Sequence, residues 1–237
     1  MDNGQSASVS MIIPTFNEAD QIVRTISRIH AASGVHDIEI IVVDGGSTDH
    51  TVALAEAAGA IAVHIGRKGR AVQMNKGAAR ATGEMLYFLH ADSIPPVDFA
   101  RKICEASLRG VTCGCFRLAF DHDHWFLRAN AWFTRFDLNA FRFGDQSLFV
   151  TKAVFRKAGG FREDLYIMED QEIIHRLKKQ GKFAVLNDRV VTSARKYLDN
   201  GIYRLQGIFY GTWMLYYLGY SQARLLKLHG KWVRGAH

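Results

Sequence analysis

The sequence predicts an α/β fold built on a central, mostly parallel β-sheet that helices cover on both faces. Strand and helix patterns alternate between residues 9 and 95, which is the order of repeated β-α-β units. The strands in this stretch are apolar throughout, as expected where both faces of a sheet are buried. The 237 residues, 48% hydrophobic and 22% charged, are enough for one substantial core with an appendage.

The elements of the first half follow from spacing and capping signals. Ile22, Ile26 and Ile29 recur at helical spacing, and Ser47-Thr48-Asp49 offers capping side chains before the next helix. The expected elements are a strand at 9–13 ended by Pro14, a helix at 19–32, a strand at 38–43, a helix at 52–58, a strand at 60–65, a helix at 69–82, and an apolar strand from residue 85 that stops at Asp92.

The second half has a mixed pattern, from which we expect a few strands beside the parallel sheet and the rest of a binding pocket. An aromatic face lies along residues 125–136, and we interpret it as core packing in preference to an acceptor platform. The expected elements are a helix at 98–109, a strand at 111–120, a helix at 124–136, a strand at 147–150, a helix closed by Gly159 and Gly160, and a helix at 169–180.

A long aromatic helix pattern at 203–220 is followed by Arg224, Lys227, Lys231 and Arg234. This pattern fits a helix packed on the protein or a homodimer interface, which we favour, and it also fits an in-plane, peripheral membrane helix. The predicted domain organisation is a main domain at 1–198, with a nucleotide-binding half at 9–95 and an acceptor half at 96–198, followed by a C-terminal helical appendage at 199–237.

Composition narrows the class of protein. The polar start at residues 1–8 lacks the features of a signal peptide, which predicts a cytoplasmic protein, with the inner face of the membrane as the alternative location. No apolar run reaches the ~18 to 20 residues of a membrane-spanning helix. Three cysteines are too few for a disulfide framework or a four-ligand zinc site. The net charge of +7 indicates attraction to anions, but no groove-reading or stacking motif supports nucleic-acid binding.

Acidic residues stand where three of the predicted strands end. Glu18 follows the first strand, Asp44 ends the second, and Asp92 ends the strand that begins at residue 85. The carboxyl ends of the strands in an open α/β sheet form the crevice where ligands bind. These acids could therefore hold a divalent cation or a ribose hydroxyl, although each one alone could equally be a turn or helix-cap residue.

Two further clusters carry charge. Arg67, Lys68 and Arg70 lie among glycines where a strand passes into a helix, which suits an anionic nucleotide as well as a solvated loop. Glu169, Asp170 and Glu172 stand at the start of a helix. Such acids complement the helix dipole, and one of them presented toward a cleft could act as a general base.

The order of these motifs resembles glycosyltransferase family 2, whose members share the GT-A fold. The resemblance covers about residues 9–196 and rests on six segments: IPTFNE at 13–18, VDGGSTD at 43–49, GRAVQMNKGA at 69–78, HAD at 90–92, GDQ at 144–146 and MED at 168–170. The last four also resemble a bacterial subfamily labelled as arsenosugar-biosynthesis or radical-SAM-associated glycosyltransferases.

The resemblance implies an inverting transfer of sugar from a nucleotide-diphosphate sugar to an acceptor hydroxyl on a small molecule or a lipid. It implies donor contacts at Pro14, Glu18, Asp44, Arg67 and Asp92. Asp92 matches the last acid of the DxD motif, which binds Mn²⁺ or Mg²⁺ at the diphosphate. Asp170 matches the general base of the ED motif, and acceptor or phosphate contacts fall at Asp145, Glu169 and Arg195.

The sequence departs from the family pattern where DxD normally begins. His90 replaces the first acid, and it is either a metal ligand, a neighbouring donor or a packed strand residue. Arg195 alone stands where processive members carry the QxxRW motif, which argues against polymer synthesis. Two alternatives follow: a non-catalytic nucleotide-sugar-binding scaffold, and a nucleotidyltransferase, which would normally carry a glycine-rich loop where this chain has PTFNEAD.

Overall fold

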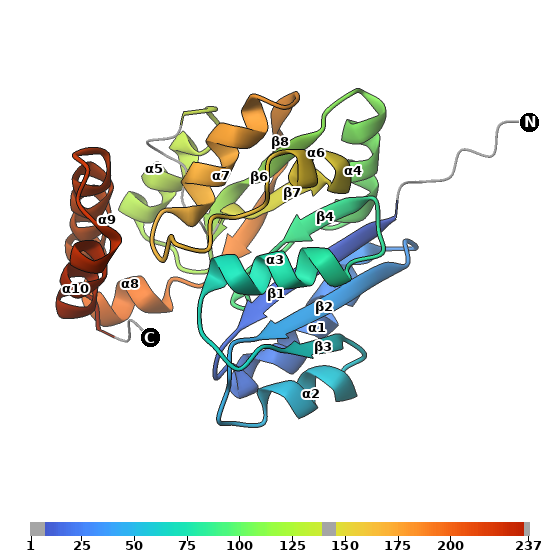
Figure 1. Ribbon diagram of the computed structural model, residues 1–237, viewed down its shortest axis with the longest axis horizontal. Coiled ribbons are helices and arrows are strands. Elements are labelled where there is room, and N and C mark those ends of the chain that lie inside the picture. Colours follow the sequence, from blue (N-terminus) through green and yellow to red (C-terminus); the bar gives the residue numbers. More distant parts are fainter. Residues whose placement is uncertain (1–7, 139–145, 235–237) are drawn as a thin grey trace, which may run out of the picture.

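The computed structural model describes residues 8–138 and 146–234. Within them, one eight-stranded sheet has the strand order β3-β2-β1-β4-β7-β6-β8-β5. Helix α3 covers one face of the sheet, and α1 and α2 lie behind the other face (Figure 1). The α/β architecture that the sequence predicts is confirmed.

The first half of the chain forms the parallel part of the sheet. Its elements are β1 (Val9–Thr15), α1 (Ala19–Ser33), β2 (Ile38–Asp44), α2 (Thr51–Ala57), β3 (Ile61–His64), α3 (Arg70–Arg80) and β4 (Met85–Phe88). β1 lies between β2 and β4 and is parallel to both, while β3 extends the sheet beyond β2. The carboxyl ends of these strands therefore share one edge of the sheet, where Thr15 is opposite Asp44 and Asp44 is opposite His64.

The second half adds antiparallel pairs to this sheet. Its elements are β5 (Ser93–Ile94), α4 (Phe99–Leu108), β6 (Cys113–Phe120), α5 (Trp125–Phe133), β7 (Leu148–Thr151), α6 (Lys152–Lys157), α7 (Glu169–Lys178), β8 (Phe183–Thr192), α8 (Arg195–Asn200), α9 (Ile202–Tyr217) and α10 (Gln222–Trp232). β7 lies between β4 and β6 and is antiparallel to both. β8 is parallel to β6 and antiparallel to the short β5.

Pro14 does not end the first strand, contrary to the prediction. β1 continues to Thr15, and Pro14 is opposite Val43 of β2. The carbonyl of Ile12 accepts a hydrogen bond from Leu89 on the β4 side, whereas the carbonyl of Thr15 accepts one from Gly45 on the β2 side. The N–H and C=O groups of one residue point toward the same neighbouring strand, and those of the next residue point toward the opposite one. The nitrogen of Pro14, two residues after Ile12, therefore faces the β4 side. The ladder between β1 and β4 ends at Ile12, so a missing N–H at Pro14 breaks no ladder bond.

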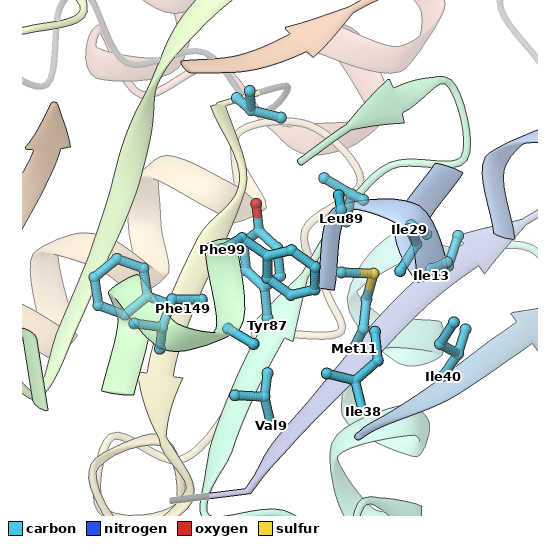
Figure 2. Packing of buried hydrophobic residues seen from close by; sticks show 14 of the residues in the cluster. Val9, Met11, Ile13, Ile29, Ile38, Ile40, Tyr87, Leu89, Phe99 and Phe149 are labelled. Atoms are coloured by element: carbon cyan, nitrogen blue, oxygen red, sulfur yellow. The ribbon is translucent and has the colours of Figure 1, made fainter. Parts of the chain in front are cut away.

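The core is divided between the two faces of the sheet by the alternation of side chains along each strand. Met11 and Ile13 of β1 belong to a buried cluster that includes residues of α1 and α4, whereas Ile12 belongs to a second cluster under α3 and α7. Figure 2 shows the first cluster, in which Met11 and Tyr87 lie among the side chains of α1, α4 and the neighbouring strands. Both faces are therefore apolar, as parallel strands require.

Gly114 marks a close approach between strands in the second half. A Cβ at this position would lie 2.2 Å from the carbonyl oxygen of Ala184 and 2.5 Å from the ring of Phe149. We expect Gly114→Ala to lower the free energy of unfolding by about 3 kcal/mol, since a backbone atom cannot move aside cheaply. Chemical denaturation measures this change. Gly207→Ala on α9 is the control, because its Cβ meets no atom within 4 Å and stability should be maintained or increased.

The aromatic face of α5 is not core packing, and that interpretation of the sequence is wrong. Trp125 is 60% exposed and Trp132 is 46% exposed, while Leu127 and Asn130 supply the buried positions of the helix. The aromatic spacing correctly predicts a helix, but spacing alone does not say which face of a helix meets the protein. Exposed aromatic residues therefore line one surface of the second half.

The C-terminal segment is a pair of helices rather than one helix with a basic tail. α9 ends at Tyr217, and the basic residues that follow lie on or just after α10. α9 and α10 lie side by side at one end of the molecule (Figure 1). Each helix among the described residues is too short or too polar to span a lipid bilayer.

Candidate active site at the carboxyl ends of the parallel strands

The loops after β1 and β2 are held together by hydrogen bonds between their side chains and backbones. The N–H of Asn17 donates to Ser47 Oγ at 2.8 Å, and Asn17 Oδ1 accepts from the N–H of Thr48 at 2.9 Å. The N–H of Glu18 donates to Thr51 Oγ1 at 2.9 Å. Asn17 has a φ of 53°, a conformation that asparagine tolerates better than most residues. This crosslink fixes the position of Glu18 at the strand edge.

Glu18, Asp92 and Arg195 come together at this edge from three distant parts of the chain. Burial raises the pKa of Glu18 above its ordinary value of 4.5, the Asp92 carboxylate raises it further, and Arg195 acts in the opposite direction. When the side-chain amide of Gln21 is oriented so that both its oxygen and its nitrogen have suitable partners, the oxygen accepts a hydrogen bond from Arg195 at 2.6 Å. Asp92 is itself held through its carbonyl, which accepts from the N–H of Ser193 at 3.2 Å.

The raised pKa of Glu18 has a consequence for stability. A carboxyl group whose pKa is raised binds its proton more tightly in the folded state than in the unfolded state. The free energy of unfolding therefore falls as the pH rises from 4.5, the ordinary pKa, through the raised pKa of the folded state. We expect Glu18→Gln to raise the melting temperature at neutral pH, because it removes a disfavoured charge. Thermal melts between pH 4 and pH 8 test this, since the gain should shrink toward the acidic end. The control is Asp20→Asn, which replaces an exposed carboxyl group in the first turn of α1 and should change the melting temperature less.

Asp44 is buried at the end of β2 and is surrounded by donors. Its Oδ2 accepts hydrogen bonds from the N–H groups of Gly46 and Ser47, both at 2.9 Å, and its Oδ1 accepts from the Ser47 hydroxyl. His64 Nδ1 lies 2.9 Å from Oδ2. Burial acts to raise the pKa of Asp44, but these hydrogen bonds outweigh it and lower the pKa. Asp44 is therefore a carboxylate at neutral pH with a fixed orientation.

Helix α3 connects the ends of β1 and β2 to the basic loop. Gln73 is buried and donates from Nε2 to the carbonyls of Thr15 and Val43, each at 2.8 Å. In the preceding loop, the ammonium of Lys68 lies 3.4 Å from the centre of the Phe16 ring. Arg67 is exposed and pairs with Glu163 at 3.2 Å. The loop thus spans from the end of β1 to the segment that precedes α7.

The acidic start of α7 also lies at this end of the molecule. Glu169 is buried and lies 3.6 Å from Arg70, the first residue of α3. Burial raises the pKa of Glu169, and Arg70 opposes that shift without cancelling it. Met168 has a φ of 71° just before the helix, so the backbone turns sharply there. Asp170 follows as a half-buried side chain on the first turn of α7.

Helix α10 holds the segment that leads into this turn. The side-chain oxygen of Gln222 accepts from the N–H groups of Tyr166 and Ile167, both at 3.1 Å. Its Nε2 donates to the carbonyl of Ile167 at 3.2 Å. Further along α10, burial together with the charges of Lys196 and Arg70 lowers the pKa of His229 to about 4. The C-terminal helices therefore adjoin the predicted site and stabilise its acidic loop.

The carboxylates at this edge suit a divalent cation that is coordinated partly by the protein and partly by a bound substrate. Mg²⁺ and similar ions are often held by one or two carboxylates, with phosphate and water oxygens completing the coordination. Glu18 and Asp92 supply two neighbouring carboxylates whose mutual repulsion a cation would relieve. Residues 8–138 and 146–234 contain no cluster of three or more His, Cys, Asp and Glu side chains able to hold a metal by themselves.

The remaining predicted residues occupy less informative places. His90 is half-buried, and its carbonyl accepts from the N–H of Ser93 at 3.1 Å. Pro14 is half-buried near the end of β1. Asp145 lies outside the described residues. The structure thus gathers Glu18, Asp92 and Arg195 in one group, while Arg67 pairs with Glu163 and Glu169 pairs with Arg70.

Sequence reasoning missed several residues that build this edge. His64 could have been found from strand alignment, because it ends β3 as Asp44 ends β2. Gln73 is a buried polar residue within a helix, which signals a partner at the strand ends. Gln222 carried no local signal, since its partners at Tyr166 and Ile167 are distant in the sequence.

This chain combines acids at the ends of its parallel strands with a basic loop and an acidic helix start, and its fold is of the GT-A type, as its matches to known proteins show. The profile of the family described as Glycosyl transferase family 2 matches residues 10–165. An uncharacterized glycosyltransferase of Mycobacterium tuberculosis is 33% identical over 179 residues, covering 71% of this chain and 68% of that protein. The chain belongs to glycosyl transferase family 2 and is a glycosyltransferase by that membership.

Two further proteins are similar over different extents. The undecaprenyl-phosphate 4-deoxy-4-formamido-L-arabinose transferase of Pseudomonas fluorescens is 33% identical over 108 residues, covering 41% of this chain and 32% of its own length. A solved mannosyltransferase of Pyrobaculum calidifontis, in complex with GDP-Man and Mn²⁺, superposes with a TM-score of 0.71 at 18% identity. That match covers 97% of this chain and 70% of the mannosyltransferase, and it establishes the shared fold.

Proposed function

We propose that this protein transfers a sugar from a nucleotide-diphosphate sugar to an acceptor hydroxyl with inversion at the anomeric carbon. The observation that carries the proposal is the convergence of Glu18, Asp92 and Arg195 from the segments that follow β1, β4 and β8, while Glu169 ties the start of α7 to Arg70 of α3. Carboxylates and a guanidinium in one place suit a ligand that combines sugar and ribose hydroxyls with a charged diphosphate.

Each predicted residue has a distinct part in this proposal. Asp44 has a fixed, ionised carboxylate, which would reach the nucleoside in place of one of its present partners, Ser47 or His64. Glu18 would contact the nucleoside from the loop after β1. Arg67 and Arg195 can neutralise diphosphate charge from the two sides of the site. Asp170 would take the proton of the acceptor hydroxyl, while the buried Glu169 next to it anchors the helix start through Arg70.

Asp92, with Glu18 as its neighbour, would hold a divalent cation together with diphosphate oxygens. When bound, Mn²⁺ or Mg²⁺ supplies positive charge that stabilises the departing nucleoside diphosphate. The mannosyltransferase that shares the fold was solved with GDP-Man and Mn²⁺, which supports a cation in this architecture. His90 stands where the first acid of the DxD motif would be, and the proposal does not depend on it as a ligand.

The acceptor and the cellular location belong to the proposal as well. The acceptor that we propose is a small molecule or a lipid, and the lipid alternative is supported by a relative that is named for undecaprenyl phosphate. We propose a cytoplasmic protein that works at the inner face of the membrane. The resemblance to arsenosugar-biosynthesis glycosyltransferases stays a prediction.

A donor screen tests the proposed function. The purified protein is melted with UDP-, GDP-, dTDP- and CMP-sugars, each with and without Mn²⁺, and slow release of free nucleotide is measured for each donor. We expect one donor class to raise the melting temperature more strongly with Mn²⁺ and to be hydrolysed slowly. Stabilisation by a donor without any nucleotide release would instead support a binding scaffold, and release of pyrophosphate from a nucleoside triphosphate would support a nucleotidyltransferase.

A further inference from the structure

An exposed aromatic face runs along α9 and continues onto α5. Tyr203, Tyr210, Met214 and Tyr217 recur at the spacing of one helix face, and Tyr203 and Tyr217 are 56% and 55% exposed. Trp125 of α5 donates its indole N–H to the Tyr203 hydroxyl at 3.1 Å. We define the aromatic face as Trp125, Tyr203, Tyr210, Met214, Tyr217 and Leu218, all of which are exposed.

A cationic stripe lies on the neighbouring helix. Arg224, Lys227, Lys231 and Arg234 are exposed and follow one another at three- and four-residue intervals, so they share one side of α10 and its end. The segment 201–234 contains Arg204 in addition and not a single Asp or Glu. The helix pair therefore presents aromatic rings beside positive charge that no acid within the segment offsets.

Both helices turn their other sides toward the protein. Leu205 of α9 and Val233 after α10 belong to the same buried cluster, together with Leu127 and Tyr197. Leu225 of α10 is also buried, and the rings of Phe209 and His229 stack between the two helices. Because the buried residues of both helices join this cluster, the exposed aromatic face and the exposed cationic stripe lie on the sides of the pair that turn away from it.

We propose that this outer surface docks α9 and α10 in the plane of an anionic lipid bilayer. Tyrosine and tryptophan side chains favour the membrane interface, where their rings contact acyl chains and their polar atoms remain hydrated. Lysine and arginine near the surface bind anionic headgroups. The 16 residues of α9 are fewer than the ~20 of a spanning helix, so the helix lies along the surface.

Charge favours a membrane over a second copy of the chain. A two-fold contact through this surface brings the same patch of each copy together. The cations of α10 would then face cations, with no acid on either helix to balance them. An anionic bilayer balances the same charges and also accepts the aromatic face. The proposal depends on this surface alone and not on which donor or acceptor the active site takes.

Vesicle flotation of the full chain without any donor tests the proposal. Vesicles of pure phosphatidylcholine are compared with vesicles of equal parts phosphatidylcholine and phosphatidylglycerol, at low and high salt. We expect binding to the anionic vesicles and a strong loss of binding at high salt. The double variant K227E and K231E should bind at least about tenfold more weakly, and Y217S with L218S should also reduce binding.

The double variant R28E and R109E is the matched control, since it removes the same charge from exposed positions on α1 and after α4. It should bind like the wild type, and melting curves show that every variant is folded. Equal binding by K227E/K231E and the control would overturn the proposal, as would no binding to anionic vesicles. A dimer in light scattering that Y217S/L218S dissociates would show that a second copy covers this face instead.

Discussion

Replacement of Asp170 by asparagine is expected to lower the rate of sugar transfer by about 10² to 10⁴. The first turn of α7 holds this side chain between the buried Glu169 and the rest of the helix, and asparagine keeps its size. An amide cannot accept the acceptor proton, so the loss should fall on kcat and leave donor binding intact. Transfer to the acceptor and the donor-induced melting shift are measured on the same preparation.

Asp164→Asn is the control for Asp170→Asn. Asp164 lies six positions earlier, is exposed, and pairs with Arg162 at 2.6 Å. Its replacement should leave transfer close to the wild-type rate. Unchanged transfer in Asp170→Asn would show that another group takes the proton. Weakened donor binding without a change in kcat would place Asp170 on the donor side of the site.

Asp92→Asn is expected to lower metal-dependent transfer by about 100-fold or more, since a bound divalent cation contributes several kcal/mol to stabilising the leaving diphosphate. The variant should also lose the part of the donor-induced melting shift that requires Mn²⁺. The same change removes the repulsion that Asp92 exerts on Glu18. The metal-free protein should therefore become more stable while its activity falls.

A second carboxyl variant separates these effects from a general loss of charge. Asp188 of β8 pairs with Lys102 at 2.6 Å, and its replacement by asparagine should keep the Mn²⁺ response. If Asp92→Asn retains the full Mn²⁺-dependent shift, the cation is held elsewhere and the role proposed for Asp92 is wrong.

The parallel half of the fold could be predicted from the sequence because its signals are local and repeated. Each apolar strand is long enough to be recognised, and each is followed by turn residues and a helix with regular spacing. β8 escaped prediction because its sequence, FAVLNDRVVT, carries Asn187, Asp188 and Arg189 in the middle. The pairing of β6 with β8 shifts register between Phe116 and Arg117, next to this polar interruption.

The acids of the candidate site could be predicted because strand order determines which chain segments meet at an edge. Glu18 and Asp92 are far apart in sequence, yet β1 and β4 are neighbours, so their ends must be close. Packing that depends on the second half could not be predicted in this way. The exposed face of α5 and the contact between Gln222 and Ile167 depend on where the C-terminal helices lie. The spacing of apolar residues in the sequence does not predict that position.

The hydrogen bonds of Gln222 indicate that a shortened form of this enzyme must include α10. Its three hydrogen bonds to Tyr166 and Ile167 come from a helix that begins after residue 221, beyond the end of the matched family region at residue 165. A chain shortened to the sheet and its covering helices would keep the acids at the strand ends but lose the hydrogen bonds that hold the segment before Asp170. Shortened or fused forms of the protein, whether for crystallography or directed evolution, should therefore retain α10.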